Sequence, residues 1–130
     1  MTHLKREPRP RSMTVIESVF RLPKGDQAEL VALANDHALF RKRTQPTGAC
    51  AGSTFANPPD DFAGRLLEES GLKGYRIGGA QLSPKHANWI VNTGGATAAD
   101  IRSLIAHART TINDCYGIDL RPEVEELGVL

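Results

Sequence analysis

The segment 52–58 reads GSTFANP and holds a hydroxyl, an amide and a glycine turn within seven positions. Ser53 and Asn57 can hydrogen-bond to an anion or a sugar. No histidine stands beside Ser53, and the GxSxG pattern of hydrolase serines is missing. Considered alone, Ser53 is therefore more often a turn-forming serine than an activated nucleophile.

The other polar candidates allow both a structural and a functional interpretation. His86 can contact a ligand or hold its own loop, and we favour the structural role. Glu123, Glu125 and Glu126 lie near the carboxyl end of the chain, where carboxylates are usually solvated. Only a pocket that removes water from one of them would make it an acid.

Glycine and cysteine patterns argue against several classes of site. The Gly78–Gly79 pair does not follow a strand and open a long helix, so it is not a dinucleotide fingerprint. Cys50 and Cys115 form no CxxC pair and have no histidine at ligand spacing, which indicates neither a disulfide framework nor a zinc site. We expect two reduced thiols, with Cys50 in a loop and Cys115 in the core.

Two long helices are predicted by their caps and apolar spacing. The first begins at Asp26, runs to about residue 42 and places His37, half-buried, on a face with three apolar residues. The second begins with a capping box of Thr97 and Asp100 and ends at Gly117. Its apolar residues recur at helical spacing: Ile101, Leu104, Ile105, Ala108, Ile112 and Cys115.

The remaining elements are shorter. The glycine- and proline-rich segment 44–59 is typical of a loop that passes close to another group. A short helix is expected from Asp60 or Asp61 to Gly71. Strands are expected at 14–22, 89–92 and 122–128. This irregular order predicts an α+β domain, with a mixed or antiparallel sheet and two to three packed helices, rather than a repeated βαβ fold.

Bulk properties restrict the function classes. The 130 residues, 40% of them hydrophobic, suffice for one domain, and the net charge of +1 creates no field that would gather nucleic acid. Residues 1–13 are expected to be a disordered basic arm, and a nucleic-acid role for it has little support because no aromatic residues alternate with its basic ones. No apolar run reaches about 18 residues and no export signal is present, so we expect a cytoplasmic protein with no membrane partner.

Four stretches together carry a family resemblance. They are RTQP at 43–46, AGSTFANP at 51–58, AGRLLEESGLKGYRIGGAQLSPKHANWIVN at 63–92 and IDLRPEVEELG at 118–128. In this order and separation the chain resembles the carboxyl-terminal, substrate-binding domain of the UDP-N-acetylenolpyruvoylglucosamine reductase family, also called UDP-N-acetylmuramate dehydrogenase or MurB. The resemblance implies that this domain occupies residues 14–130.

The resemblance also implies a reaction and its residues. The family reduces UDP-N-acetylglucosamine enolpyruvate to UDP-N-acetylmuramate in peptidoglycan synthesis, using NADPH through bound FAD. The hydride comes from the flavin and the proton from this domain. The motif match assigns proton donation to Ser53, stabilisation or protonation of the enol to Glu123, and a contact with the UDP moiety to Asn57.

The resemblance also implies substrate contacts at three further positions. Gly52 belongs to the same substrate-binding loop, and Arg41 and Arg43 fall where the family holds the diphosphate, with no basis for choosing between them. Ala56 stands where lysine is common in the family, which is expected to weaken anion binding by the loop.

The family's flavin-binding domain has no counterpart in these residues. We therefore expect that the chain alone binds neither FAD nor NADPH, and that it is inactive without a flavin-binding domain or subunit in trans. The alternative is a non-catalytic UDP-sugar-binding module or a remnant. Retention of Ser53 and Glu123 argues against a remnant, since a pure binder needs neither a proton donor nor an enol-stabilising acid.

Overall fold

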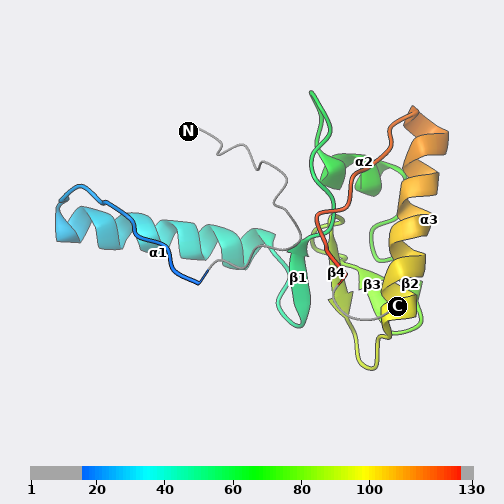
Figure 1. Cartoon of the computed structure of the whole chain (residues 1–130), viewed down its shortest axis with the longest axis horizontal. Helices are drawn as coiled ribbons and strands as arrows, with labels where there is room; N and C mark the ends of the chain where they lie inside the picture. Colours follow the sequence, from blue (N-terminus) through cyan, green and yellow to red (C-terminus); the bar gives the residue numbers. More distant parts are fainter. Residues whose placement is uncertain (1–15, 127–130) are drawn as a thin grey trace.

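The computed structural model describes residues 16–126, which form three helices and one sheet (Figure 1). The predicted basic arm, 1–13, lies outside the described residues. The α+β prediction is confirmed. The helices are α1 (Gln27–Thr44), α2 (Ala63–Glu69) and α3 (Ala98–Tyr116), and the strands are β1 (Cys50–Ser53), β2 (Arg76–Ile77), β3 (Ala80–Leu82) and β4 (Trp89–Asn92).

The four strands make one antiparallel sheet in the order β1-β4-β3-β2. In β3, Ala80 and Leu82 are buried while Gln81 between them is half-buried, as expected for a strand with one face on the core. Helix α3 packs against β2 and β3. A β-carbon at Gly79 would overlap the backbone of Ala96, so only glycine permits this close approach.

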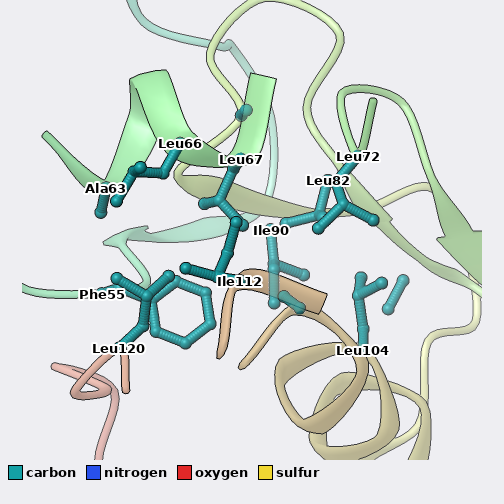
Figure 2. Packing of buried hydrophobic residues seen from close by; sticks show 13 residues of the cluster. Phe55, Ala63, Leu66, Leu67, Leu72, Leu82, Ile90, Leu104, Ile112 and Leu120 are labelled. Carbon is teal, nitrogen blue, oxygen red and sulfur yellow. The ribbon is translucent and has the colours of Figure 1, made fainter. Parts of the chain in front are cut away.

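The hydrophobic core lies between the sheet, α2 and α3 (Figure 2). Side chains from both helices meet Phe55 and Leu120, which come from the segments before α2 and after α3. Burial of apolar side chains contributes about 1.5–3 kcal/mol each, so these contacts dominate the stability of this region. The cluster comprises Phe55, Ala63, Leu66, Leu67, Leu72, Ala80, Leu82, Ala87, Ile90, Leu104, Ala108, Ile112 and Leu120.

Helix α3 forms as its sequence predicts. Thr97 and Asp100 make a reciprocal capping box, and Gly117 ends the helix with φ 68° in the left-handed region. The prediction that Cys115 belongs to the core is wrong, because its side chain is exposed. Residues 113–117 are all exposed, so the last turn of α3 extends beyond the elements that cover its earlier turns.

Helix α1 also begins as predicted, with the Asp26 side chain accepting a hydrogen bond from the Glu29 backbone N–H at 3.0 Å. Its packing differs from the expectation, because no α1 residue is buried and His37 is exposed rather than half-buried. The helix projects away from the sheet (Figure 1). A hydrogen bond from Lys85 Nζ to the Lys42 carbonyl, 2.5 Å long, links its end to the loop after β3.

Two strand predictions and one loop prediction need correction. The described part of 14–22, from residue 16, is not a strand, because no described strand lies beside it to complete a ladder. The described part of 122–128 contributes a single β-bridge, from Pro122 to Phe55, rather than a strand. The segment 44–59, expected to be a loop, contains β1, so Cys50 lies in a strand. The strand at 89–92 is confirmed as β4.

Candidate functional site

We call residues 52–58 the Ser53 loop. This loop begins in the last two residues of β1, where the pairing with β4 is irregular. Ser53 pairs with Trp89 of β4, and the register is irregular between Cys50 and Ser53. Gly52 has φ 92°, a conformation that a residue with a side chain would adopt only under strain. Ser53 is exposed whereas the next residue, Thr54, is 1% exposed. The chain therefore presents the Ser53 hydroxyl at the surface directly beside a buried anchor.

Asn88 holds the segment after Ser53 in place. Its side-chain oxygen accepts a hydrogen bond from the Phe55 N–H at 2.9 Å, and its side-chain nitrogen donates to the Phe55 carbonyl at 2.8 Å. Its own carbonyl accepts from the Thr54 N–H at 2.8 Å. Asn88 is 4% exposed, so these bonds lie in a low-dielectric interior where they are strong.

The sequence interpretation missed Asn88. Asn88 stands directly before the predicted strand 89–92, where asparagine is also common in turns, so the sequence carries no signal for a buried amide.

The carboxyl-terminal segment approaches the other side of the Ser53 loop. The Glu123 N–H donates to the Thr54 carbonyl at 2.8 Å, and the Ala56 N–H donates to the Arg121 carbonyl at 2.9 Å. Glu123 thus lies opposite the residue that follows Ser53, although the two are far apart in sequence. The structure brings Gly52, Ser53 and Glu123 to one edge of the fold.

Asn57 has a structural contact in the same loop. Its Oδ1 atom accepts a hydrogen bond from the Ala63 N–H at 3.1 Å, at the start of α2. Side-chain oxygens commonly satisfy such free N–H groups. The predicted cap at Asp60 or Asp61 is realised differently: the Asp61 carboxylate accepts from the Phe62 N–H at 2.6 Å, and Phe62 is the N-cap residue. Because the cap uses the Asn57 oxygen, its amide NH₂ is the group that can donate to a ligand.

A cavity of about 330 Å³ opens beside Asn57. Arg121 also lines it, and an arginine there suits an anionic group because its guanidinium can form paired hydrogen bonds. Arg121 was not identified from the sequence, where a single arginine before a proline carries no distinct signal. The cavity is lined by Ala56, Asn57, Pro58, Pro59, Ile118, Asp119, Leu120 and Arg121.

Arg41 and Arg43 lie at the carboxyl end of α1 and are exposed. Arg41 Nε donates to the Gln45 side chain at 3.3 Å, and the Arg43 guanidinium lies 6.0 Å from the centre of the Phe40 ring. These local contacts hold both arginines at the end of their own helix. Neither arginine contacts Asn57 among the described residues. They are connected to the site only by the chain between α1 and β1 and by the Lys85 bond to the Lys42 carbonyl.

His86 makes contacts that organise its own loop. The Nδ1 atom of its ring accepts a hydrogen bond from the Asn88 backbone N–H at 3.3 Å. Its own backbone N–H donates to the Ser83 hydroxyl at 3.3 Å. A β-carbon at Gly64 would lie 2.8 Å from the His86 ring, so the ring packs against the start of α2. These contacts give His86 a structural role beside Asn88.

The glycine pair in the β2–β3 turn does not fit the phosphates of a dinucleotide. The Gly79 N–H points at the Asp100 carboxylate, 3.4 Å away. Hydrogen bonds from the Thr97 and Gly79 backbone lower the pKa of Asp100, so a negative charge already occupies this turn. This turn therefore offers no cradle for the phosphates of FAD or NADPH.

Two further tests cover residues 16–126. No group of three or more His, Cys, Asp or Glu residues is placed to hold a metal ion among them. No helix in this range has the length and apolar character needed to cross a membrane.

Comparison with known proteins identifies the family. The sequence profile for "UDP-N-acetylenolpyruvoylglucosamine reductase, C-terminal domain" matches residues 44–127. The chain is 50% identical to UDP-N-acetylenolpyruvoylglucosamine reductase 1 of Bacillus cereus over 115 residues, which are 88% of this chain and 38% of that protein. It is 46% identical to the reductase of Bacillus subtilis over 114 residues, with coverage of 87% and 38%.

A solved structure agrees. The crystal structure of the reductase (MurB) from Thermus caldophilus superposes with a TM-score of 0.71 at 36% identity and covers 81% of this chain but 37% of its own. The chain thus spans less than two-fifths of the length of each of these three relatives. It belongs to the UDP-N-acetylenolpyruvoylglucosamine reductase family, of which it represents the carboxyl-terminal domain.

Proposed function

We propose that this chain binds UDP-N-acetylglucosamine enolpyruvate and donates a proton to it during its reduction to UDP-N-acetylmuramate, a step of peptidoglycan synthesis in the cytoplasm. The observation that supports the proposal is the hydrogen bond from the Glu123 N–H to the Thr54 carbonyl, because it holds the backbone of Glu123 next to the residue that follows Ser53.

The proposed chemistry follows from the two groups. Reduction of the enolpyruvyl group adds hydride to its terminal carbon and a proton to the neighbouring carbon, which bears the ether oxygen. Ser53 supplies that proton, and because a hydroxyl is a weak acid its position over the carbon must provide most of the effect. Glu123, in its protonated form, stabilises the developing enol by donating a hydrogen bond to its oxygen.

The UDP moiety is bound further along the loop. Donation from the Asn57 NH₂ group and pairing with Arg121 hold the diphosphate at the cavity beside α2. Arg41 and Arg43 are the alternative diphosphate contacts, since the chain between α1 and β1 links them to the Ser53 loop. FAD and NADPH belong to the part of the reductase that this chain does not span, which acts as a flavin-binding partner.

An amide NMR titration of the chain with UDP-N-acetylglucosamine enolpyruvate tests the proposal, with FAD added to a parallel sample. We expect the signals of Ser53, Asn57 and Glu123 to shift with the UDP-sugar, and no signal to shift with FAD. Absence of any shift at millimolar UDP-sugar would contradict the proposal.

Asn57→Asp is a sharp variant for the same titration. Aspartate retains the oxygen that caps α2, so the fold should persist. It replaces the NH₂ donor by a negative charge next to the diphosphate, so the affinity for the UDP-sugar should fall at least about tenfold. Ser53→Ala is the control, because it removes the proposed proton donor and should leave binding nearly unchanged. If the chain binds the UDP-sugar but does not support turnover with a flavin-binding partner, the non-catalytic module is the correct function.

A further inference from the structure

Trp89, the single tryptophan of the chain, lies directly opposite Ser53 in the sheet. The Thr54 N–H donates to the Asn88 carbonyl at 2.8 Å, so this hydrogen bond joins the residues that flank the pair and not the pair itself. In such non-hydrogen-bonded pairs the two side chains approach most closely, and both point to the same face of the sheet. The Trp89 indole and the Ser53 hydroxyl are therefore neighbours.

The face that carries this pair is turned away from the core. Ile90, the next residue of β4, is 9% exposed and pairs with Leu82 of β3, and both belong to the core cluster (Figure 2). Trp89 and Val91 alternate with Ile90 and are half-buried, while Ser53 is exposed. The tryptophan thus presents part of its ring to the surface beside the proposed proton donor.

Hydrogen bonds on both sides hold Trp89 in place. Its backbone N–H donates to the His86 carbonyl at 3.1 Å, and its carbonyl accepts from the Ser83 N–H at 2.8 Å. The His86 ring lies beside the indole, with 6.4 Å between the ring centres and an angle of 55° between the planes. Because His86 is itself bonded to Ser83 and Asn88, the position of the indole is largely set before a ligand binds.

The space next to the pair is open. A β-carbon built at Gly52 would meet no atom within 4 Å apart from its chain neighbours. Ser53 offers a hydroxyl and Trp89 an extended apolar ring, which together suit a sugar, since a sugar has hydroxyl edges and an apolar face of C–H groups. A phosphate or a carboxylate gains little from the face of an indole, because that face attracts cations. The chemistry of the pair therefore favours a sugar ring.

We propose that the Trp89 indole packs against the N-acetylglucosamine ring of the substrate, and that this contact determines where the enolpyruvyl group lies relative to the Ser53 hydroxyl. The inference rests on the proposed function, from which it takes the substrate. It adds a contact for the sugar, which lies between the diphosphate and the enolpyruvyl group.

Three ligands test the contact: UDP, UDP-N-acetylglucosamine and UDP-N-acetylglucosamine enolpyruvate. Each is titrated into the 130-residue chain, and the indole N–H signal and the fluorescence of Trp89 are followed together with the backbone amide signals. We expect both sugar-bearing ligands to shift the indole signal and the emission, since the sugar ring displaces water from the indole. UDP alone should shift the amide signal of Asn57 and leave both Trp89 signals unchanged.

Variants at the same position give a second measurement. Trp89→Ala should weaken the binding of UDP-N-acetylglucosamine at least about tenfold and leave the affinity for UDP unchanged, because aromatic anchors carry a large share of binding energy. Trp89→Phe keeps an aromatic ring and should weaken binding by less than about threefold. Tyr116→Ala, at an aromatic residue of α3 that is 40% exposed, is the matched control and should bind both ligands like the unmodified chain. The amide spectrum of each variant verifies that it is folded.

Two results would overturn the inference and leave the proposed function intact. In the first, the sugar-bearing ligands shift the amide of Asn57 without changing either Trp89 signal, a result that needs no variant and holds even where Trp89→Ala does not fold. In the second, Trp89→Ala lowers the affinity for UDP as much as that for UDP-N-acetylglucosamine.

Other outcomes separate the two proposals in the opposite direction. A response of Trp89 to both sugar-bearing ligands, with no shift at Ser53 or Glu123, would support the sugar contact and reject the proposed proton donation. No shift with any of the three ligands would reject both.

Discussion

Two helices of nearly equal length, α1 and α3, begin in the same way but differ in how they pack. Both start with a side-chain cap, at Asp26 and at Thr97. Yet α3 buries Leu104, Ala108 and Ile112 against the sheet and α2, whereas α1 buries no residue. A cap and a helical sequence therefore determine where a helix begins, and its packing depends on whether another element meets its apolar side.

The same contrast separates the two parts of the candidate site. Ser53 and Glu123 lie on segments fixed by buried bonds to Asn88 and Thr54, inside the packed region. Arg41 and Arg43 lie on the unpacked helix, where only local contacts restrain them. The first pair is positioned by the fold of this chain, and the second depends on what α1 packs against.

The largest expected effect comes from removing a core side chain. Leu66→Ala should lower the free energy of unfolding by about 2–5 kcal/mol, because Leu66 is fully buried and its loss leaves a cavity. Leu33→Ala in α1 is the matched control and should change it by less than about 0.5 kcal/mol, since Leu33 is half exposed. Urea unfolding followed by Trp89 fluorescence measures both. Equal losses would mean that α1 is part of the packed region.

Asn88→Ala should have the next largest effect. It leaves the Phe55 N–H and carbonyl without their partners in the interior, at a cost of about 2–4 kcal/mol. Asn35→Ala, at an exposed position of α1, serves as the control. Amide hydrogen exchange at Phe55 and Glu123 gives a second measurement. Unchanged protection at both amides in Asn88→Ala would show that Asn88 does not hold the Ser53 loop.

The two helix caps provide a smaller and more direct comparison. Thr97→Ala should lower the free energy of unfolding by about 1 kcal/mol, because it removes a cap from a helix that belongs to the core. Asp26→Ala should instead reduce the helicity of α1, measured by Cα chemical shifts, and leave the unfolding of the core unchanged. If Asp26→Ala destabilises the core as much as Thr97→Ala does, the distinction between the two helices fails.

Local signals explain which elements the sequence predicted. Helix α3, its capping box, β4 and the starting point of α1 depend on residues within a few positions of one another, and all four are confirmed. The strand expected at 14–22 and the closing strand expected at 122–128 depend on distant partners, and in the described residues neither forms as expected. Alternating apolar residues show that a strand could form there, but they do not supply the neighbour that it needs.

The candidate site divides in the same way. Ser53, Asn57 and Glu123 were chosen through a family resemblance to short motifs, and their roles remain predictions. How these residues lie relative to one another became clear only from the structure. The hydrogen bond between Glu123 and Thr54 and the bond between Asn88 and Phe55 join segments that are far apart in the sequence, and no local pattern predicts such pairs. Buried amides of this kind are identified only when the backbone groups that they satisfy are known.

The smallest expected effect is on the pH dependence of the packed region. Hydrogen bonds from the Thr97 and Gly79 backbone lower the pKa of Asp100 in the folded state. The unfolded chain therefore binds this proton more readily, and the stabilising contribution is present above a pH of about 3.9 and is lost as the pH falls below it.

Asp100→Asn keeps an oxygen that can accept these bonds and removes the titration. Its free energy of unfolding, followed by the fluorescence of the single tryptophan in β4, should therefore change less than that of the unmodified chain between about pH 5 and pH 3. Some dependence should persist, since Arg65 also lowers the pKa of Asp61. An identical pH profile for both proteins would mean that the charge of Asp100 contributes nothing measurable to the stability of the core. In that respect the cap of α3 would then resemble the cap of α1.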